Sequence, residues 1–333
     1  MTNTSKLRHL NFFGFPNQLE NAIKRNLNAP KNLNALQKEI KVKKFCFYFN
    51  YTNGIDLDPR HINILILWEP KSVIPIQYKR SILDKFNIII PIGAIRSSNI
   101  GTNYYVEHPY NFKNYKPNNY QTKKDVVMIN ANKFSAEAFS NYGLRRMVSK
   151  KLAKSELAYD LFGPDWNCNK FKEFRARWGA IKRSLQARNI PNLVESFSLL
   201  FRYYPEHAGL SLDKFQTLNK YQFTLIIENE SDWITEKIYD AIIAESIPLY
   251  FGPSLQNYPK LKACAFELPK EKNKIAETIF AIVLSDKNSN QISKKFRKIK
   301  QLKKDKKFWK LLSYEHISNE ISSYVISQLN SKV

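Results

Sequence analysis

Short apolar segments alternate with amphipathic stretches along the first hundred residues. Four segments are rich in branched and aromatic residues and are bounded by proline, glycine, asparagine or aspartate, the pattern of buried strands. They are residues 10–13, 45–49, 62–68 and 86–92. Helical patterns lie between Pro16 and Lys41 and over residues 75–85. Strands that alternate with helices predict a parallel sheet covered on both faces.

A second α/β series follows a polar stretch without periodicity, which we interpret as a linker between domains. The linker covers residues 108–124, and the series then continues with the predicted strands 125–130, 159–163, 221–227 and 247–251. Helical patterns cover residues 134–156, 234–245 and much of 272–333. The sequence thus predicts a first α/β domain over residues 1–120, a second over 121–285 and a basic helical tail over 286–333. Ligands of open α/β sheets bind beyond the carboxyl ends of the strands, so we expect a site there.

The distribution of charge bears mainly on the function of the predicted tail. The chain of 333 residues has a net charge of +24 at pH 7, and residues 294–310 hold ten basic residues and one acid. Phe296, Ile299 and Leu302 recur every three residues among these lysines, so a helix here can lie on an anionic membrane surface. Two alternatives remain open, namely a helix packed back on the first domain and a nucleic-acid-binding surface. The chain has no recognisable nucleic-acid module, so nucleic acid is not expected as a partner.

The cysteines and the absence of long apolar stretches predict the location. Cys46, Cys168 and Cys264 form no CxxC motif and no metal-ligand spacing, which favours a reducing compartment. No stretch approaches the ~18 apolar residues of a membrane span, and the first residues lack a signal-peptide pattern. We therefore expect a cytoplasmic protein, peripheral on the inner face of the membrane if residues 294–310 bind it.

The candidate chemistry lies in residues 228–237, ENESDWITEK, which follow a strand and open a helix. Backbone amides at a helix start, together with the ammonium group of Lys237, suit a phosphate or diphosphate. Glu236 suits the two hydroxyls of a ribose, and Asn229 and Trp233 can line the same pocket. The alternative is an ordinary helix cap with a solvated glutamate–lysine pair.

Residues 219–258 resemble the core motif of the alpha-1,3-fucosyltransferases, glycosyltransferase family 10. The similarity runs from the strand KYQF through IEN and WITEK to IP and GPS. It implies the GT-B architecture, two Rossmann-like domains facing a cleft, and an inverting transfer from GDP-fucose. By this resemblance Glu236 holds the ribose and Lys237 the diphosphate, with Asn229 nearby. Trp233 stands where the family has a tyrosine, so the aromatic face is kept and a hydroxyl is lost.

The resemblance also implies an arginine on the first long helix of the second domain. Arg145 fits the family's spacing best, and Arg146 is the fallback. A cation there would stabilise negative charge on the leaving diphosphate. The alternative for Arg145 is a solvated helix residue.

Glu69 follows the strand 62–68 and is our candidate for the base that takes the acceptor's proton. The resemblance places a glutamate-containing turn after the equivalent strand. The alternative is a strand-end acid with no catalytic role. Asp56 and Asp58 resemble a metal-binding DxD motif, but we interpret them as loop residues because lysine and arginine replace the ion in this family. His108 and His207 have no assigned role.

The sequence therefore predicts an inverting glycosyltransferase that moves fucose from GDP-fucose to a hydroxyl of a glycan. The expected linkage is alpha-1,3 or alpha-1,4, with a role in glycan biosynthesis or protein glycosylation and a surface glycan or lipopolysaccharide as acceptor. No metal site and no cofactor are required for this chemistry, and a divalent cation would at most stimulate it. The alternatives are a GT-B transferase with another nucleotide sugar and a basic nucleic-acid-binding protein.

Overall fold

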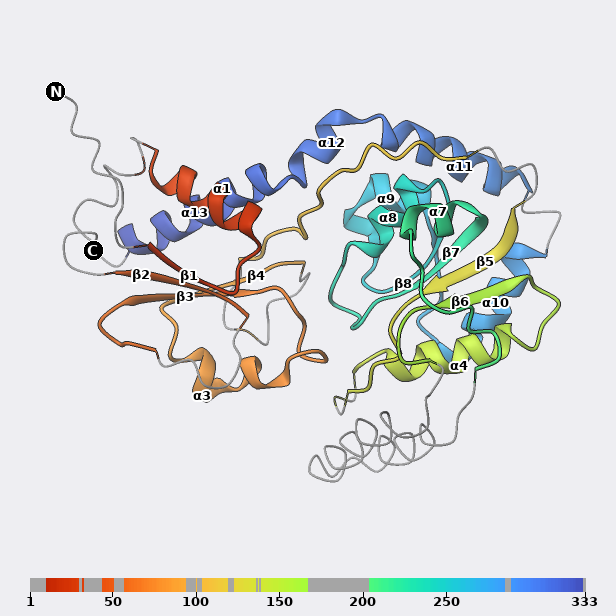
Figure 1. Ribbon diagram of the computed structural model, residues 1–333, viewed down its shortest axis with the longest axis horizontal. Coiled ribbons are helices and arrows are strands. Elements are labelled where there is room, and N and C mark those ends of the chain that lie inside the picture. Colours follow the sequence, from red (N-terminus) through yellow and green to blue (C-terminus); the bar gives the residue numbers. More distant parts are fainter. Residues whose placement is uncertain are drawn as a thin grey trace. The chain divides into compact units, whose positions relative to one another are not determined.

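The computed structural model describes residues 10–29, 32, 44–50, 57–93, 100, 104–118, 123–135, 137, 139–166, 204–284 and 289–331. The chain divides into two compact units. Unit 1 combines Met1–Phe112 with Lys306–Val333, and unit 2 is Lys113–Asp305. Each contains one parallel sheet with helices (Figure 1). Two units with parallel sheets confirm the predicted α/β fold class.

The sheet of unit 1 consists of four parallel strands in the order β1-β2-β3-β4. The strands are β1 (Leu10–Phe13), β2 (Phe45–Phe49), β3 (Ile62–Leu67) and β4 (Ile88–Pro91). Phe47 lies opposite Ile64, and Ile64 lies opposite Ile88, so apolar side chains share one face. All six residues of β3 are buried, as expected for an inner strand of a covered sheet.

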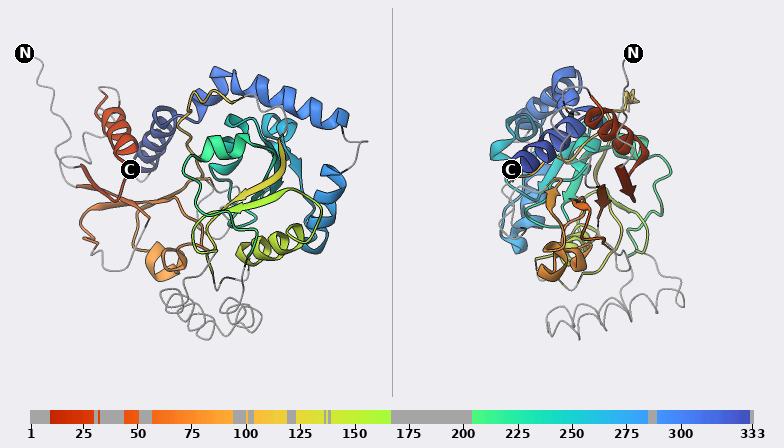
Figure 2. Two further views of the ribbon diagram at one scale, coloured as in Figure 1. Left: turned by 45° about the vertical axis from the view of Figure 1, so that its right-hand side comes forward. Right: turned by 90° about the vertical axis from the view of Figure 1, so that its left-hand side faces the viewer.

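Two helices from opposite ends of the sequence cover this face. The helices α1 (Asn17–Leu27) and α13 (Tyr314–Asn330) lie side by side on it, while α3 (Arg80–Leu83) lies on the other side of the sheet (Figures 1 and 2). A 3-10 helix, η1 (Pro75–Tyr78), precedes α3. Apolar side chains of α1 and α13 recur at helical spacing and are buried against the strands. These side chains are Leu19, Ile23, Leu27, Ile317, Ile321, Val325 and Leu329.

Unit 2 contains a five-stranded parallel sheet in the order β6-β5-β7-β8-β9. The strands are β5 (Lys124–Ile129), β6 (Tyr159–Phe162), β7 (Tyr221–Ile227), β8 (Ile247–Phe251) and β9 (Phe266–Glu267). From β5 the chain first adds β6 on one side and later β7 on the other. The direction of winding therefore reverses between β5 and β7, which makes their carboxyl ends a topological switch point.

Helices cover both faces of this sheet (Figures 1 and 2). On one side lie α4 (Tyr142–Leu152) and α10 (Ile275–Val283). On the other lie α7 (Lys214–Asn219), α8 (Lys237–Ile243), α9 (Pro259–Cys264) and α11 (Ser289–Lys303). Short 3-10 helices occur at Leu255–Asn257 (η2) and Lys272–Lys274 (η3).

The residues of the predicted basic helical tail, 286–333, are divided between the two units after Asp305. In unit 2, α11 packs on α8, α9 and β8, and Ile299 and Leu302 are 0% and 5% exposed. In unit 1, α12 (Lys306–Leu311) buries Trp309 against Tyr110 and Phe112. The apolar face that the sequence offered to a membrane is therefore occupied by protein. No helix in the described part of the chain has the length and apolar character needed to cross a bilayer.

Several predicted element bounds need correction. The helix expected over residues 134–156 begins only at Tyr142, and the helix expected over 234–245 begins at Lys237. The helix expected from Pro16 ends at Leu27, and most of residues 28–41 lie outside the described part. The predicted strands are otherwise found to within about two residues, and the two-residue β9 was missed.

Candidate functional site

Polar side chains gather at the switch point of unit 2. The strand β5 ends next to Asn130, and β7 ends next to Glu228 and Asn229. Val127 of β5 lies opposite Thr224 of β7, so these two carboxyl ends lie at the same edge of the sheet. Ligands of open α/β sheets bind at such an edge, and this one contains the motif singled out from the sequence.

Glu228 is the fully buried centre of this cluster, with 0% of its surface exposed. Its Oε1 accepts a hydrogen bond from the amide of Thr235 at 3.0 Å, and its Oε2 accepts one from the Thr235 hydroxyl at 2.7 Å. The ammonium group of Lys237 lies 3.4 Å from Oε2. The Glu228 carboxylate thus already accepts the hydrogen bond of the Thr235 amide, one of the backbone amides near the helix start that we had expected to bind a phosphate.

Lys237 and Glu236, the two residues at the start of α8, have different environments. The Lys237 ammonium donates to the Thr235 hydroxyl at 2.7 Å, and its side chain is 17% exposed. The Glu236 side chain is 43% exposed, with the Lys214 ammonium 4.0 Å away. Since α8 has only seven residues and Thr235 is occupied, positive charge for a phosphate has to come mainly from side chains.

Arg145 connects α4 to the end of β7. Its Nε and one terminal nitrogen donate to the carbonyl oxygen of Ile227 at 3.0 and 2.6 Å, and the same terminal nitrogen donates to Asn229 Oδ1 at 2.8 Å. The residue is 3% exposed, and burial lowers the pKa of its guanidinium to about 10, partly offset by Tyr142 and Glu228. Arg145 is therefore still charged at neutral pH and is not the solvated helix residue of the alternative interpretation.

Arg146, the fallback candidate, lies elsewhere. It is 1% exposed and donates to Asn132 Oδ1 at 3.1 Å and to the Lys133 carbonyl oxygen at 2.8 Å. Arg146 thus fixes the loop after β5, whereas Arg145 fixes the loop after β7. Of the two, the structure brings only Arg145 together with Asn229.

Three further side chains around this cluster have buried polar atoms without a hydrogen-bond partner among the described residues. They are the indole nitrogen of Trp233, the hydroxyl of Tyr250 and both amide atoms of Asn141, and these residues are 4%, 1% and 0% exposed. The backbone amide of Asn141 donates to the Asn229 carbonyl oxygen at 2.9 Å, so Asn141 borders the same loop. Buried polar atoms without partners are costly, so a partner from outside the described residues would stabilise these positions.

Glu69 lies in unit 1, directly after β3, where its backbone is fixed. The amides of Trp68 and Glu69 both donate to Asn50 Oδ1, at 2.9 and 3.1 Å. The carbonyl oxygen of Glu69 accepts from Gln77 and Tyr78, at 2.8 Å each. These four contacts use only backbone atoms of residues 68 and 69, so the fold places the half-buried Glu69 at the end of β3 whatever its side chain does.

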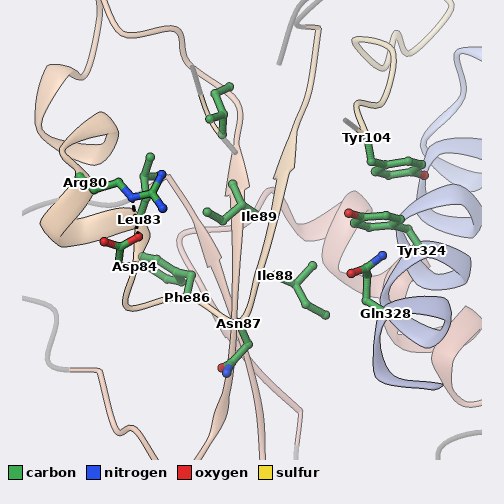
Figure 3. Close-up of a pocket in the computed structure, with 11 residues that line it drawn as sticks. Arg80, Leu83, Asp84, Phe86, Asn87, Ile88, Ile89, Tyr104, Tyr324 and Gln328 are labelled. Carbon is green, nitrogen blue, oxygen red and sulfur yellow. Dashed lines mark ion pairs between the residues drawn. The ribbon is translucent and has the colours of Figure 1, made fainter. Parts of the chain in front are cut away.

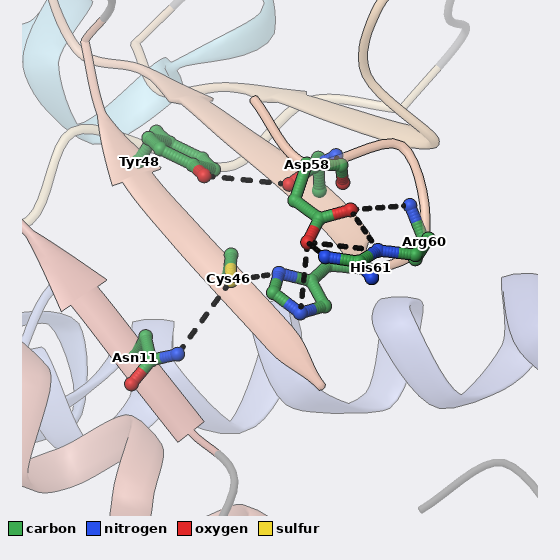
Figure 4. A network of polar contacts seen from close by, with 7 residues as sticks. Asn11, Cys46, Tyr48, Asp58, Arg60 and His61 are labelled. Carbon is green, nitrogen blue, oxygen red and sulfur yellow. Dashed lines mark hydrogen bonds and ion pairs between the residues drawn. The ribbon is translucent and has the colours of Figure 1, made fainter. Parts of the chain in front are cut away.

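The remaining acids and histidines have structural contacts. Asp58 forms an ion pair with Arg60 at 2.7 Å and lies 3.5 Å from His61, and these contacts hold the pKa of its carboxyl well below its usual range (Figure 4). Asp56 lies outside the described residues. His207 donates through Nε2 to the Gly163 carbonyl oxygen at 2.8 Å, and His108 is buried against Trp68. Within the described residues, no three histidine, cysteine or acidic side chains are grouped for a metal ion.

Sequence reasoning missed Glu228, Thr235 and Asn141 as members of the cluster. Glu228 was part of the quoted motif, but a single acid at the end of an apolar strand gives no signal of burial. Asn141 lies 88 residues before Asn229 in the sequence, and only the fold brings the two together.

Residues 207–311 match the family model described as glycosyltransferase family 10 (fucosyltransferase), C-terminal part. The matched segment includes β7, the Glu228 cluster and α8. Over these residues the chain is similar to glycosyltransferase family 10. The match bears out the family that the motif around Glu236 and Lys237 resembles. A search among curated protein sequences finds no match to the chain.

Solved glycosyltransferase structures resemble the chain at low sequence identity. An alpha1,3-fucosyltransferase is 13% identical, with 96% of this chain and 94% of that chain covered and a TM-score of 0.47. The pneumococcal O-GlcNAc transferase GtfA, in complex with UDP and GlcNAc, is 12% identical with a TM-score of 0.48. The similarity to GtfA covers 90% of this chain but only 60% of GtfA. Alr3699/HepE from Anabaena, in complex with UDP and glucose, is 13% identical over 93% of this chain and 80% of that chain, with a TM-score of 0.49.

Proposed function

We propose that this protein is an inverting glycosyltransferase that transfers fucose from GDP-fucose to a hydroxyl group of a glycan. The observation that carries the proposal is the family 10 match over residues 207–311, which contain the polar cluster at the switch point of unit 2. In this proposal unit 2 binds the donor, and Glu69 of unit 1 is the base.

The cluster has the chemistry that a nucleotide diphosphate requires. Lys237 and Arg145 supply two positive charges beside one buried carboxylate, Glu228, so the three groups sum to one positive charge. The exposed carboxylate of Glu236 suits the ribose hydroxyls, and Asn229 supplies an amide beside the guanidinium of Arg145. Trp233 is only 4% exposed, so its ring forms part of the wall of the donor site and offers little surface on which a nucleotide base could stack.

In the proposed reaction, Glu69 removes the proton of the acceptor hydroxyl while its oxygen bonds to the anomeric carbon of fucose. The bond from that carbon to the diphosphate oxygen breaks in the same step, and GDP leaves with the electron pair. A single displacement inverts the configuration at the anomeric carbon. Lys237 and Arg145 stabilise the charge that develops on the leaving oxygen, so the proposal needs no metal ion.

The acceptor side of the proposal is an alpha-1,3 or alpha-1,4 linkage on a surface glycan, lipopolysaccharide or protein-linked glycan. A cytoplasmic location with peripheral membrane contact through residues 294–310 belongs to the same proposal. Since the apolar face of α11 is buried, such contact would use the exposed basic side chains alone.

A donor screen tests the proposed function. Purified full-length protein is incubated with GDP-fucose, GDP-mannose and UDP-sugars, and the release of free nucleotide is measured with and without a glycan acceptor. We expect turnover with GDP-fucose that persists in a chelator and gives a product of inverted configuration. Turnover with a UDP-sugar alone would instead support the alternative of a transferase with another nucleotide sugar.

The alternative of a nucleic-acid-binding protein is tested by filter binding over a salt series. Contacts with several phosphates would make nucleic-acid affinity fall steeply with salt concentration. Tight binding of this kind, together with no turnover of any nucleotide sugar, would replace the enzyme proposal.

A further inference from the structure

A pocket of about 670 Å³ opens in unit 1, apart from every residue of the proposed donor and base chemistry (Figure 3). This volume falls within the range of roughly 300–1,000 Å³ that is common for small-molecule sites. The pocket lies at the edge strand β4, near the residues that precede that strand, Arg80 to Asn87.

The pocket and Glu69 lie at opposite ends of the sheet of unit 1. Since β3 and β4 are parallel, with Ile64 opposite Ile88, the pocket residue Ile88 lies at the amino end. Glu69 follows the carboxyl end of β3. Five extended residues from Ile64 to Glu69 span roughly 16 Å, so a ligand in the pocket does not occupy the place of the reacting hydroxyl.

Aromatic and aliphatic side chains form the walls. Leu83 and Phe86, 5% and 8% exposed, line one side of the edge strand, and Tyr104 and Tyr324 line the other. The two tyrosine rings stack with centroids 3.7 Å apart and planes 6° apart. The hydroxyl of Tyr104 donates to the carbonyl oxygen of Glu320 at 3.1 Å, which fixes the aromatic wall to α13. Contacts within the protein therefore hold the Tyr104–Tyr324 side of the pocket in place.

Planar polar groups surround these apolar walls. Arg80 and Asp84 form an ion pair of 2.9 Å on α3 and the turn after it, and Gln328 of α13 projects from the opposite side (Figure 3). Asn87 lies between them and is held by the backbone amide of Asn63, which donates to its Oδ1 at 2.7 Å. Carboxylate, guanidinium and amide groups together offer both acceptors and donors.

This combination discriminates between classes of ligand. A phosphate would need an uncompensated cation, but Arg80 is already paired with Asp84. A purely apolar ligand would remove water from Gln328 and from the exposed Arg80–Asp84 pair without replacing its hydrogen bonds, which costs free energy. A neutral sugar has apolar C–H faces for the aromatic and aliphatic walls, and hydroxyls that both donate and accept for the planar polar groups.

We propose that the pocket binds a neutral carbohydrate, with room for more than one sugar unit. Binding of a sugar by unit 1 does not depend on the donor chemistry of unit 2. That the sugar is a part of the glycan acceptor distant from its reacting hydroxyl rests on the proposed function. The pocket would then select long acceptors over short ones.

The proposal is tested by saturation-transfer NMR on the full-length protein with lactose, N-acetyllactosamine and maltotriose, each with and without saturating GDP. The variant Gln328→Trp fills the pocket from α13. Ser323→Trp is the matched control, because Ser323 is exposed on the same helix and does not line the pocket. Thermal melts establish that each variant is folded.

We expect at least one sugar to give a signal that survives GDP, falls at least tenfold in Gln328→Trp and is unchanged in Ser323→Trp. If Gln328→Trp does not fold, Arg80→Ala replaces it, because its side chain is 81% exposed. Loss of this hydrogen-bonding group should weaken sugar binding roughly fivefold.

The proposal is overturned if none of the three sugars gives a signal, if GDP abolishes the signal, or if the pocket variants leave it intact. Sugar binding that depends on the pocket in a protein without turnover of GDP-fucose would refute the proposed function and leave the pocket assignment standing. Turnover of GDP-fucose without sugar binding at the pocket would refute the pocket assignment and leave the proposed function standing.

Discussion

Arg145 and Asn229 come from two different elements of unit 2 and meet at 2.8 Å, between the guanidinium and the amide oxygen. The same guanidinium donates twice to the Ile227 carbonyl oxygen, so one buried cation orders the loop that follows β7. That loop leads to Trp233, Glu236 and Lys237. The position of the proposed donor residues thus depends on a side chain from α4.

This contact gives a first prediction, which separates Arg145 from its neighbour Arg146. Arg145→Lys keeps the charge but loses the forked hydrogen bonds to Ile227 and Asn229. Arg146→Lys is the matched control, since it is equally buried but bonds to Asn132 and Lys133. Both variants should lose about 1–3 kcal/mol of stability, whereas only Arg145→Lys should also weaken GDP binding, by roughly tenfold.

Calorimetric titration with GDP and thermal unfolding of both variants check this prediction. Equal GDP affinities in the two variants would mean that Arg145 acts only as a structural residue. A greater loss of GDP affinity in Arg146→Lys would transfer the diphosphate role to the fallback residue.

A second prediction concerns the ion pair between Glu228 and Lys237. Lys237→Met removes the ammonium group and retains much of the stem, so among the described residues the buried carboxylate keeps its side-chain hydrogen bonds with Thr235 alone. We expect GDP affinity to fall at least tenfold, because a phosphate-binding charge is lost next to a remaining negative one. Glu228→Gln should lower the free energy of unfolding by about 1–3 kcal/mol.

The double variant Glu228→Gln/Lys237→Met completes a cycle for stability. Because the two side chains touch, we expect the losses in unfolding free energy to be non-additive by about 1 kcal/mol. Additive losses would show that the pair contributes nothing beyond its separate contacts with Thr235.

A third prediction concerns Gly252, which follows β8 and packs against the cluster. A Cβ atom at this position would lie 2.6 Å from the Tyr250 hydroxyl and 2.8 Å from Cγ of Glu228. Both neighbours are buried, so neither can move cheaply. Gly252→Ala should cost about 1–3 kcal/mol of stability through overpacking and displace the Glu228 carboxylate.

Gly209→Ala is the contrasting control for this position. Gly209 has a φ of +95°, and among the described residues no atom lies within 4 Å of the place that a Cβ would take. The cost of Gly209→Ala is therefore backbone strain alone, about 1–2 kcal/mol. Gly252→Ala should reduce both the melting temperature and the affinity for GDP. Gly209→Ala should reduce the melting temperature and leave the affinity for GDP unchanged. Unchanged GDP affinity in Gly252→Ala would show that the position of the Glu228 carboxylate does not affect donor binding.

The local sequence pattern predicted the strands, but the composition of the candidate site depends on contacts between residues far apart in the sequence. Runs such as residues 62–67 are apolar at nearly every position, and a covered parallel strand uses such a run. The start of α4 was misplaced by eight residues because Asn141 is tied to Asn229, a contact that has no local signal. Glu236 and Lys237 were identified because they are adjacent in a motif. Glu228 was not, because a single acid at the end of an apolar strand carries no local signal of burial.

The buried apolar face of the tail leads to a fourth prediction. Ile299 and Leu302 pack within unit 2, so any binding of residues 294–310 to an anionic membrane must be electrostatic. Lys294, Lys298 and Lys304 belong to this basic stretch, and reversing their charge should reduce sedimentation with phosphatidylserine vesicles. Binding by the unmodified protein should disappear at about 0.5 M salt, because screening removes surface attraction. Binding that survives this salt would require an inserted apolar element elsewhere.

The last prediction tests whether Glu69 is the base. Its backbone is held by Asn50, Gln77 and Tyr78, and these contacts remain when the side chain is changed. The backbone of residue 69 should therefore keep its position in Glu69→Gln, and thermal melts establish that the variant is folded. It should also bind GDP with unchanged affinity, because the proposed donor contacts all lie in unit 2. Turnover of GDP-fucose with a glycan acceptor should fall by about 10²–10⁴-fold, the usual contribution of a positioned base.

The same variant separates a catalytic role from a positioning role by its pH dependence. In the unmodified protein, the rate should fall as pH decreases and the base becomes protonated, and Glu69→Gln should lack this limb of the profile. Asn50→Ala is the companion variant, because it removes the acceptor of the Trp68 and Glu69 amides and leaves the Glu69 carboxylate in the chain. It should lower the rate less than Glu69→Gln and keep the pH limb. A rate in Glu69→Gln close to that of the unmodified protein would require another carboxylate as the base.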